Sequence, residues 1–585
     1  MYISELHLKN FRLFEDFKVA FQPGLNLLVG ENNIGKTHVI DALRLVFGYG
    51  FGKRDISPRP QDIRHDDAGQ PVADHFDIIL TFKGLSTEQL GWFITLAMPG
   101  EGSDVARLTY RYSKSVGRQN REVYLPRVWG GDNEGNRVEG EILASLTCVF
   151  LQPLRDAESD LRPGRNSRTA VLLDSLKTDD DASQVEKALD AANQQIDALP
   201  LIVNATGKIN KNLGEISGDT LAQKSKLRLS EPSFRRIAQA VRTLVGPDDL
   251  RLFSMDENGL GYNNLLYAAT VLAELKDMTA DGIDLGILCI EEPEAHLHPQ
   301  LQAPLVRYLE DQASSGIQVI ATTHSSVIAS SVGIEKSIVI HQDRSGAPSP
   351  NRSTFAKPLA ECNLNDKERR LLSRYLDITR SCLLFARGVI LVEGISEQLL
   401  LPVFAMKIGK SEKDVHLDLK NSAVSVISVG GLSLAPFYKL FKQDQLRIPC
   451  AVITDGDSEP EDSDSQGVYE PCSRAQGVQG DMDGCCQAYI AARTFEYELA
   501  YHGNASIMVK HFKDRHPDLG TDLEKQVAAT DSPDEQARFI QRALTSAYKA
   551  DLAQDLLYAW TSDDASLVVP PYIEKAIKFA CGVSE

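Results

Sequence analysis

The chain has 585 residues, 43% of them hydrophobic, so it is long enough for about three or four domains with large buried cores. Its 62 Lys and Arg against 81 Asp and Glu give a net charge of −19, so any DNA binding must use local basic patches or metal ions. The nine cysteines form no C-x-x-C pair, which favours reduced thiols. No signal-peptide pattern and no apolar run of ~20 residues are present, so we expect a cytoplasmic protein without membrane segments.

The first part of the chain has an α/β pattern. Alternating apolar residues predict a strand at 3–8, and an apolar run predicts another at 25–29. A helix is predicted from Lys36, and short strands are predicted over 75–82 and 107–112.

The middle of the chain changes character twice. Residues 165–245 carry apolar side chains at helical spacing, which predicts a helical insertion whose apolar face packs on the core or on a second chain. Strands at 287–290 and 317–320, each flanked by helical patterns, then predict a parallel sheet. Residues 340–380 are interpreted as a polar linker.

A second α/β pattern follows this linker. Its predicted strands are 388–392, 423–427 and 450–453. Much of the acidic, Gly- and Ser-rich stretch 455–484 is predicted to be loop, and 488–585 is predicted to be mostly helical.

A phosphate-binding motif lies between the predicted strand at 25–29 and the helix from Lys36. Residues 30–37 read GENNIGKT and fit G-x-x-x-x-G-K-[ST] in full. In such a loop backbone N–H groups surround the phosphates, the lysine reaches the β- and γ-phosphates, and the threonine binds Mg²⁺. We expect ATP to contact Asn32, Asn33, Gly35, Lys36 and Thr37.

Two later strands end in residues that complete a nucleotide site. The strand at 287–290 leads into Glu291 and Glu292, one acid for the Mg²⁺ shell and the next to polarise the attacking water. His324 follows the strand at 317–320, where a γ-phosphate-sensing histidine belongs.

This order resembles the ABC-type ATPases of DNA repair and chromosome maintenance, in which N-F-R at residues 10–12 is typical. The resemblance places a D-loop at 294–299, a reading favoured over a metal site at its His-x-His, and a Q-loop at Gln152, for which an ordinary loop glutamine is the alternative. The signature motif departs from the family, since 259–264 reads GLGYNN with Tyr262 in place of a glycine. ABC ATPases of this kind bind ATP between two subunits, so the resemblance implies a homodimer.

Further acids follow the strands of the second pattern. Glu393 comes directly after 388–392, Glu397 lies in the next helix, and Asp455 and Asp457 come after 450–453. The carboxyl ends of parallel strands share one edge of a sheet, where ligands bind. Clustered carboxylates suit Mg²⁺ or Mn²⁺, and two such ions can activate water and stabilise a leaving phosphate-ester oxygen. The acids from 459 to 464 are interpreted as a solvated loop.

Glu393-Gly and Asp455-x-Asp457 resemble a Toprim domain, the metal-binding fold of topoisomerases, primases and some nucleases. An ABC-type ATPase followed by Toprim is similar to the overcoming-lysogenization-defect (OLD) family nucleases, over nearly the whole chain. That resemblance implies Glu397 and Glu496 as further metal ligands and Lys549 as a lysine assisting cleavage, although the motif's glycine is Ala550 here and a surface lysine is the alternative. The nuclease subunit of the Gabija anti-phage system has the same architecture.

We therefore expect an α/β protein with an ABC-type ATPase domain (1–164 and 246–375), a helical dimerisation insertion (165–245), and a Toprim domain with a helical C-terminal region (376–585). The expected function is an ATP-regulated, metal-dependent DNA endonuclease in anti-phage defence or DNA repair. Expected cofactors are ATP and Mg²⁺, with Mn²⁺ or Ca²⁺ as alternatives at the Toprim site. Expected partners are DNA and further copies of the chain, in a homodimer or a higher homo-oligomer, with a separately encoded helicase as a further partner if the system is Gabija-like. The alternative is a non-nucleolytic ATPase scaffold with a structural Toprim domain.

Overall fold

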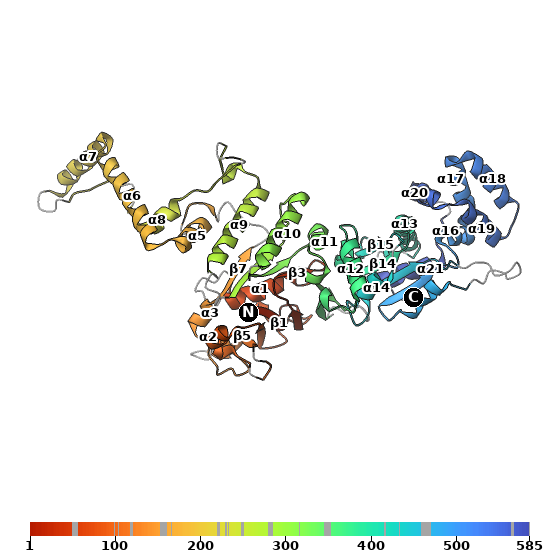
Figure 1. Cartoon of the computed structure of the whole chain (residues 1–585), viewed down its shortest axis with the longest axis horizontal. Coiled ribbons are helices and arrows are strands. Elements are labelled where there is room, and N and C mark those ends of the chain that lie inside the picture. The colour runs from red at the N-terminus through yellow and green to blue at the C-terminus, as the bar shows by residue number, and fades with distance from the viewer. Residues whose placement is uncertain are drawn as a thin grey trace.

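The computed structural model describes residues 1–48, 56–98, 100–102, 104–116, 121–151, 161–164, 167–218, 223–227, 231, 233–246, 248, 251–278, 285–314, 316–343, 353–412, 414, 417–431, 433–457, 470–562 and 567–583. Two α/β bodies lie side by side, and helices extend outward from each of them (Figure 1). The α/β fold class is confirmed. No helix among these residues is long and apolar enough to cross a membrane.

The N-terminal body contains an antiparallel sheet in the order β2-β1-β4-β5-β6. Its strands are β1 (Tyr2–Phe11), β2 (Phe14–Ala20), β4 (His75–Lys83), β5 (Ala106–Val116) and β6 (Glu122–Gly130). The apolar residues that alternate along β1 are buried, and they share a core with α1 (Lys36–Phe47). Short helices α2 (Thr87–Trp92) and α3 (Gly140–Ala144) lie in the connections.

A second sheet in this body runs in the order β13-β12-β3-β11-β10-β7 and is parallel except for β13. Its strands are β3 (Leu25–Val29), β7 (Leu146–Leu151), β10 (Leu285–Glu291), β11 (Gln318–Thr322), β12 (Ser337–Gln342) and β13 (Thr354–Pro358). Strands β3, β10 and β11 are buried throughout, as expected for a sheet covered on both faces. The flanking helices are α1, α9 (Leu260–Met278), α10 (Pro299–Ser314) and α11 (Ser326–Val332).

The expected helical insertion is helical in the structure. It comprises α5 (Arg168–Leu176), α6 (Asp179–Asp197), α7 (Pro200–Ser217) and α8 (Phe234–Ala240), followed by a hairpin of β8 (Leu244–Val245) and β9 (Phe253–Ser254). Helices α6 and α7 project away from the ATPase body (Figure 1). None of residues 200–217, all of which the structure describes, is buried.

The prediction of a polar linker over 340–380 is wrong for the described part of that stretch. Strand β13 extends the ATPase sheet, and α12 (Asp366–Tyr375) and the 3-10 helix η7 (Arg380–Phe385) follow it. Buried leucines, Leu359, Leu372 and Leu383, anchor these elements. These leucines hold the described part of the stretch against the core, so it is not a linker. Residues 344–352 lie outside the described part.

The C-terminal body is built on a parallel sheet in the order β15-β14-β16-β17. Its strands are β14 (Gly388–Val392), β15 (Val424–Ser428), β16 (Cys450–Thr454) and β17 (Cys486–Ile490). Its helices are α13 (Ile395–Glu412), α14 (Ala435–Tyr438), α15 (Ser473–Gly480), α16 (Phe495–Leu499), α17 (Ala505–Arg515), α18 (Pro517–Ala528), α19 (Pro533–Ala543), α20 (Ser546–Ser562) and α21 (Pro571–Cys581). Within the stretch 455–484, α15 is the helix of the described part, and the other described residues there are loop or turn.

The two bodies share one hydrophobic core. Ile328 and Val332 of α11 belong to the same buried cluster as Leu384 of η7, Leu391 of β14 and Ile427 of β15. Because packed cores transmit displacement rather than absorb it, the two bodies are mechanically connected.

Candidate nucleotide and metal sites

The phosphate loop is held in a conformation that requires its two glycines. Gly30 has φ +143° and Gly35 φ +105°, values that side chains with a Cβ rarely adopt. A Cβ on Gly30 would lie 2.2 Å from the Ile340 carbonyl oxygen, and one on Gly35 would lie 2.5 Å from the Phe14 ring. The loop is therefore packed tightly from behind, with its open side facing a cavity.

Lys36 is buried inside this loop. Its Nζ donates to the carbonyl oxygens of Gly30 and Glu31, both at 2.6 Å. Burial lowers the pKa of Lys36 to about 8, against the opposing effect of Glu292 and other nearby acids. Such a desolvated ammonium group gains more from an added phosphate charge than an exposed one does.

Glu291 ends β10 beside the threonine of the phosphate loop. Its carboxylate accepts a hydrogen bond from Thr37, and burial raises the pKa of Glu291. The Oε1 atom of Glu291 is buried without a hydrogen-bond partner among the described residues. A hard carboxylate oxygen left unpaired next to a threonine hydroxyl fits the Mg²⁺ that accompanies a nucleotide.

Glu292 and His324 face each other across the same cavity. Glu292 Oε1 lies 3.4 Å from His324 Nε2, and Glu292 has φ +45°, an uncommon conformation for a residue with a Cβ. Burial and the nearby Lys36 lower the pKa of His324, against the opposing effect of Glu292. The cavity has a volume of about 650 Å³ and is lined by Asn32, Asn33, Gly35, Lys36, Thr37, His38, Glu292 and His324.

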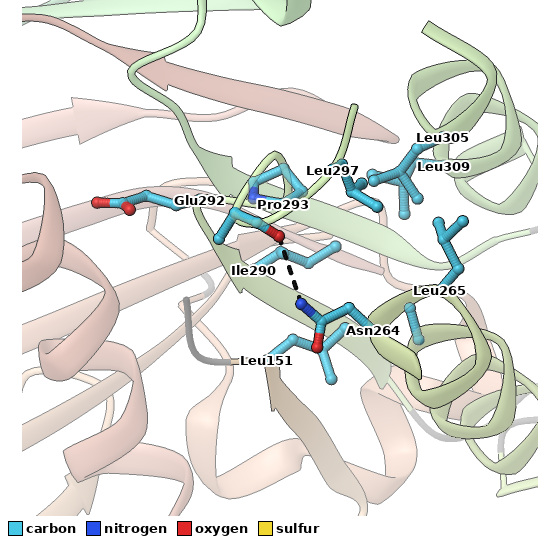
Figure 2. A pocket seen from close by; sticks show the side chains of 11 residues that line it. Leu151, Asn264, Leu265, Ile290, Glu292, Pro293, Leu297, Leu305 and Leu309 are labelled. Carbon is cyan, nitrogen blue, oxygen red and sulfur yellow. Dashed lines mark hydrogen bonds between the residues drawn. The ribbon is translucent and has the colours of Figure 1, made fainter. Parts of the chain in front are cut away.

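The segment expected to be the D-loop packs on the helix that carries the signature motif. Glu294 accepts hydrogen bonds from Thr323 Oγ1 and from the His324 backbone N–H, both at 2.8 Å. Asn264 of α9 donates to the Ala295 carbonyl at 3.3 Å, and Figure 2 shows Glu292 directed away from this contact and its apolar surroundings. Tyr262 is exposed on the first turn of α9.

Two further sequence predictions concern this region, the Q-loop residue Gln152 and the His-x-His of the D-loop. Gln152 lies outside the described residues. His296 and His298 take part in no grouping of three His, Cys, Asp or Glu suited to a metal ion within the described part of the chain.

The second site lies at the carboxyl edge of the C-terminal sheet. Glu393 follows β14, and its carboxylate accepts hydrogen bonds from the Thr454 hydroxyl and, at 3.2 Å, from the Asp455 backbone N–H. Asp455 follows β16 and accepts from the Phe495 N–H at 2.9 Å, which ties it to the start of α16. The sheet and α16 thus bring together acids that are up to 103 positions apart in sequence, since Glu496 lies in α16.

Burial makes this edge unusual in its electrostatics. Burial, followed by repulsion from Glu496, raises the pKa of Glu397 to about 7. Burial, together with Glu397, Glu496 and Glu393, raises the pKa of Asp455 well above its ordinary value. Carboxylates that are costly to ionise together are the groups that a divalent cation stabilises.

Lys549 belongs to this cluster rather than to the general surface. Its Nζ lies 2.7 Å from Glu496 Oε2, so α20 is tied to α16. Burial opposes the charge on Lys549, but Glu496, Asp455 and Glu397 together raise its pKa.

Arg474 of α15 is a site residue that the sequence did not reveal. Its guanidinium lies 2.9 Å from Glu393 Oε2 and 2.7 Å from Asp457 Oδ2. Asp457 itself is half-exposed and has φ +45°. Arg474 belongs to no motif of the sequence, so only the fold places it here.

The donor chemistry of this edge fits a divalent cation, although the carboxylates are engaged by cationic side chains. No group of three or more His, Cys, Asp or Glu side chains in the described ranges is arranged to hold a metal ion. Arg474 pairs with Glu393 and Asp457, and Lys549 pairs with Glu496.

Comparisons with known proteins agree on two parts of the chain. Residues 1–92 and 144–329 match the family model of an AAA ATPase domain, and 384–457 match the Toprim domain of overcoming lysogenization defect protein-like proteins. The chain is 25% identical over 531 residues to an OLD nuclease of Thermus scotoductus, covering 86% of this chain and 93% of the relative. It is 23% identical to the endonuclease GajA of Bacillus cereus strain HuB5-5, covering 99% of each.

Proposed function

Because the chain belongs to the overcoming-lysogenization-defect family of nucleases, with an ATPase domain and a Toprim domain, we propose that it is a DNA endonuclease that depends on divalent metal and is regulated by ATP. The OLD nuclease and the GajA endonuclease support the nuclease activity, since both relatives align along most of their length. The ATP control and the metal dependence are supported by the two sites described above.

The observation that carries the metal dependence is the buried group of Glu397, Asp455 and Glu496. These three carboxylates would hold divalent cations, which would supply Lewis-acid activation of water and of the leaving oxygen of the phosphodiester. Glu393 and Asp457 are proposed as further ligands at the open side of the group. Lys549, once released from Glu496, provides a positive charge for the phosphate in the transition state.

The proposed ATPase chemistry follows from the lining of the first cavity. Lys36 binds the β- and γ-phosphates, and Thr37 and Glu291 hold the Mg²⁺ that accompanies ATP. Glu292 orients and deprotonates the attacking water, because its carboxylate is half-exposed and directed into the cavity. Neutral His324 contacts the γ-phosphate as a hydrogen-bond donor.

The metal ion, the oligomeric state and the partner are proposed on separate grounds. Mg²⁺ is the favoured ion at the Toprim site, with Mn²⁺ or Ca²⁺ as alternatives, because all the donors there are hard oxygens. A homodimer is supported by the exposed apolar side chains of α7. The helicase partner and the role in anti-phage defence follow from the family resemblance alone.

The test is nicking of supercoiled plasmid DNA in Mg²⁺ or Mn²⁺ and in EDTA. We expect nicking by the wild type only with metal, loss of nicking in Asp455→Asn, and wild-type nicking in Asp518→Asn, which changes an exposed acid of α18. Equal nicking by Asp455→Asn would place the chemistry elsewhere. A well-folded wild type that binds metal at this site but never nicks DNA would favour the alternative, an ATPase scaffold with a structural Toprim domain.

A further inference from the structure

The nucleotide and metal sites are linked by one short stretch of chain. Residues 380–387, here called the coupling segment, consist of η7 and the two residues that lead into β14. The segment packs against α11, which begins two residues after His324, and against β15, which ends near Glu393. It therefore lies between the two sites in space as well as in sequence.

On the nucleotide side, the coupling segment contacts the phosphate loop itself. Arg387 Nε lies 2.5 Å from Glu31 Oε2, and Glu31 is the residue whose carbonyl accepts from Lys36. A triphosphate in the loop would draw Lys36 toward the phosphates and compete with that hydrogen bond. The position of Glu31, and with it the ion pair to Arg387, would then change with nucleotide occupancy.

A second contact reaches the helix beyond His324. The fully buried Ser381 donates from Oγ to the Ser326 carbonyl at 2.9 Å. Ser326 opens α11, two residues after the histidine that faces Glu292. A shift of His324 toward a γ-phosphate is thus passed to the coupling segment through α11.

On the metal side, the coupling segment holds the strands that position Glu393. The backbone N–H of Arg387 donates to the Ala423 carbonyl at 2.9 Å, next to the point where β14 and β15 begin to pair. Arg380 Nε donates to the Ser428 carbonyl at 3.1 Å. Beyond Ser428, the Val429 N–H donates to the Val392 carbonyl at 2.9 Å and the Gly431 N–H to the Glu393 carbonyl at 3.4 Å.

We propose that Arg387 and Ser381 are positioning residues that couple occupancy of the phosphate loop to the placement of Glu393. The shared core supports this inference. Leu383 and Leu384 of the coupling segment lie in the same buried cluster as Ile328 and Leu391. Because such a core is close-packed, a displacement of one body is transmitted to the other. The proposal deepens, and rests on, the proposed ATP control of the metal site. It requires both sites to bias one structural element, which is what an allosteric coupling consists of.

The test is amide hydrogen exchange of the full-length protein with and without a non-hydrolysable ATP analogue, at one fixed Mg²⁺ concentration. The amides of Val429 and Gly431 report on the backbone around Glu393, and those of residues 31–37 report on nucleotide binding. In the wild type we expect the analogue to change exchange at Val429 and Gly431 by about fivefold or more, the lower end of ordinary allosteric couplings. In Arg387→Gln and in Ser381→Ala the change should fall below about twofold while residues 31–37 are still protected.

Lys439→Gln is the matched control, since it breaks another ion pair between the bodies, Lys439 Nζ to Glu368 Oε1 at 2.6 Å, away from the coupling segment. It should respond like the wild type. The inference is overturned if nucleotide protects residues 31–37 of the wild type without changing Val429 or Gly431. It is also overturned if both variants keep the full response, or if Lys439→Gln loses it. Because no DNA is cut in this experiment, its outcome is independent of the nuclease proposal.

Discussion

At the scale of single residues, Lys36 and Glu292 have separable roles in the proposed ATP site. Lys36→Ala removes a charged contact to phosphate worth about 1.5–3 kcal/mol, so ATP affinity should fall roughly 10- to 100-fold. Glu292→Gln keeps the Mg²⁺ ligands and should bind ATP normally while hydrolysis slows about 100-fold or more. Titration with a fluorescent ATP analogue and a phosphate-release assay separate the two effects, and normal turnover by Glu292→Gln would remove it as the base.

Glu397 gives the metal site a pH dependence. Its pKa is raised to about 7 in the folded protein, so the folded state retains a proton that the unfolded state has lost above its ordinary value of 4.5. This contribution to stability is complete below about pH 4.5 and is lost as pH rises through 7. Without metal, the melting temperature of the wild type should therefore fall between pH 6 and pH 8 by more than that of Glu397→Gln.

Added Mg²⁺ should remove the difference in melting temperature between the two proteins at pH 8. The reason is that Glu397 is then deprotonated, and the ion stabilises its carboxylate. The measurement is thermal unfolding of both proteins at each pH, with Mg²⁺ and with EDTA. Parallel pH profiles for wild type and Glu397→Gln would show that Glu397 does not titrate in this window.

Lys549 tests whether a cation in the cluster acts in cleavage. Lys549→Ala should slow nicking about 100-fold, because a positive charge is lost from the transition state, while Mn²⁺ binding stays at least as tight. The exposed Lys525 serves as the control, and Lys525→Ala should nick like the wild type. Unimpaired nicking by Lys549→Ala would mean that its ion pair with Glu496 is only structural.

At the scale of elements, the exposed apolar residues of helix α7 predict that two copies of the chain associate. Leu201 and Ile216 are 77% and 84% exposed on a helix that projects from the ATPase body. Each such side chain is worth about 1.5–3 kcal/mol when buried, so a second subunit that covers them gains substantial stability. The intact protein should be a dimer, and Leu201→Asp with Ile216→Asp should give monomers at low micromolar concentration.

Light scattering coupled to size exclusion measures this directly. Ile94→Asp is the matched control, because Ile94 is 71% exposed but lies on the ATPase body rather than on the insertion. A monomeric wild type, or a double variant that remains dimeric, would contradict the assignment of α7 as an interface.

The elements also show which structural features can be read from sequence. Strands β3, β10, β14 and β16 were predictable because each is a short apolar run followed at once by a functional residue. Strand β13 was missed because its burial comes from its partner β12 rather than from its own apolar pattern. Arg474 was missed because its role arises only when α15 packs beside the sheet edge, a contact with no local sequence signal.

At the scale of the whole molecule, the two sites are chemically independent but share one core. Phosphodiester hydrolysis is already downhill, so ATP need not drive it. We therefore propose that ATP acts by binding one arrangement of the bodies better than another. We favour inhibition of nicking by bound ATP, since a nuclease that shares a compartment with its own DNA needs restraint.

The measurement that tests this account most directly is the rate of plasmid nicking by wild type and Lys36→Ala, each in Mg²⁺ or Mn²⁺ with and without ATP. We predict that ATP, at a concentration near the wild-type Kd, changes the wild-type rate, that Lys36→Ala still nicks in metal alone, and that the same ATP concentration leaves the rate of Lys36→Ala unaltered. A folded, metal-loaded Lys36→Ala protein that cuts no DNA under any condition would make ATP part of the cutting cycle and would contradict the account.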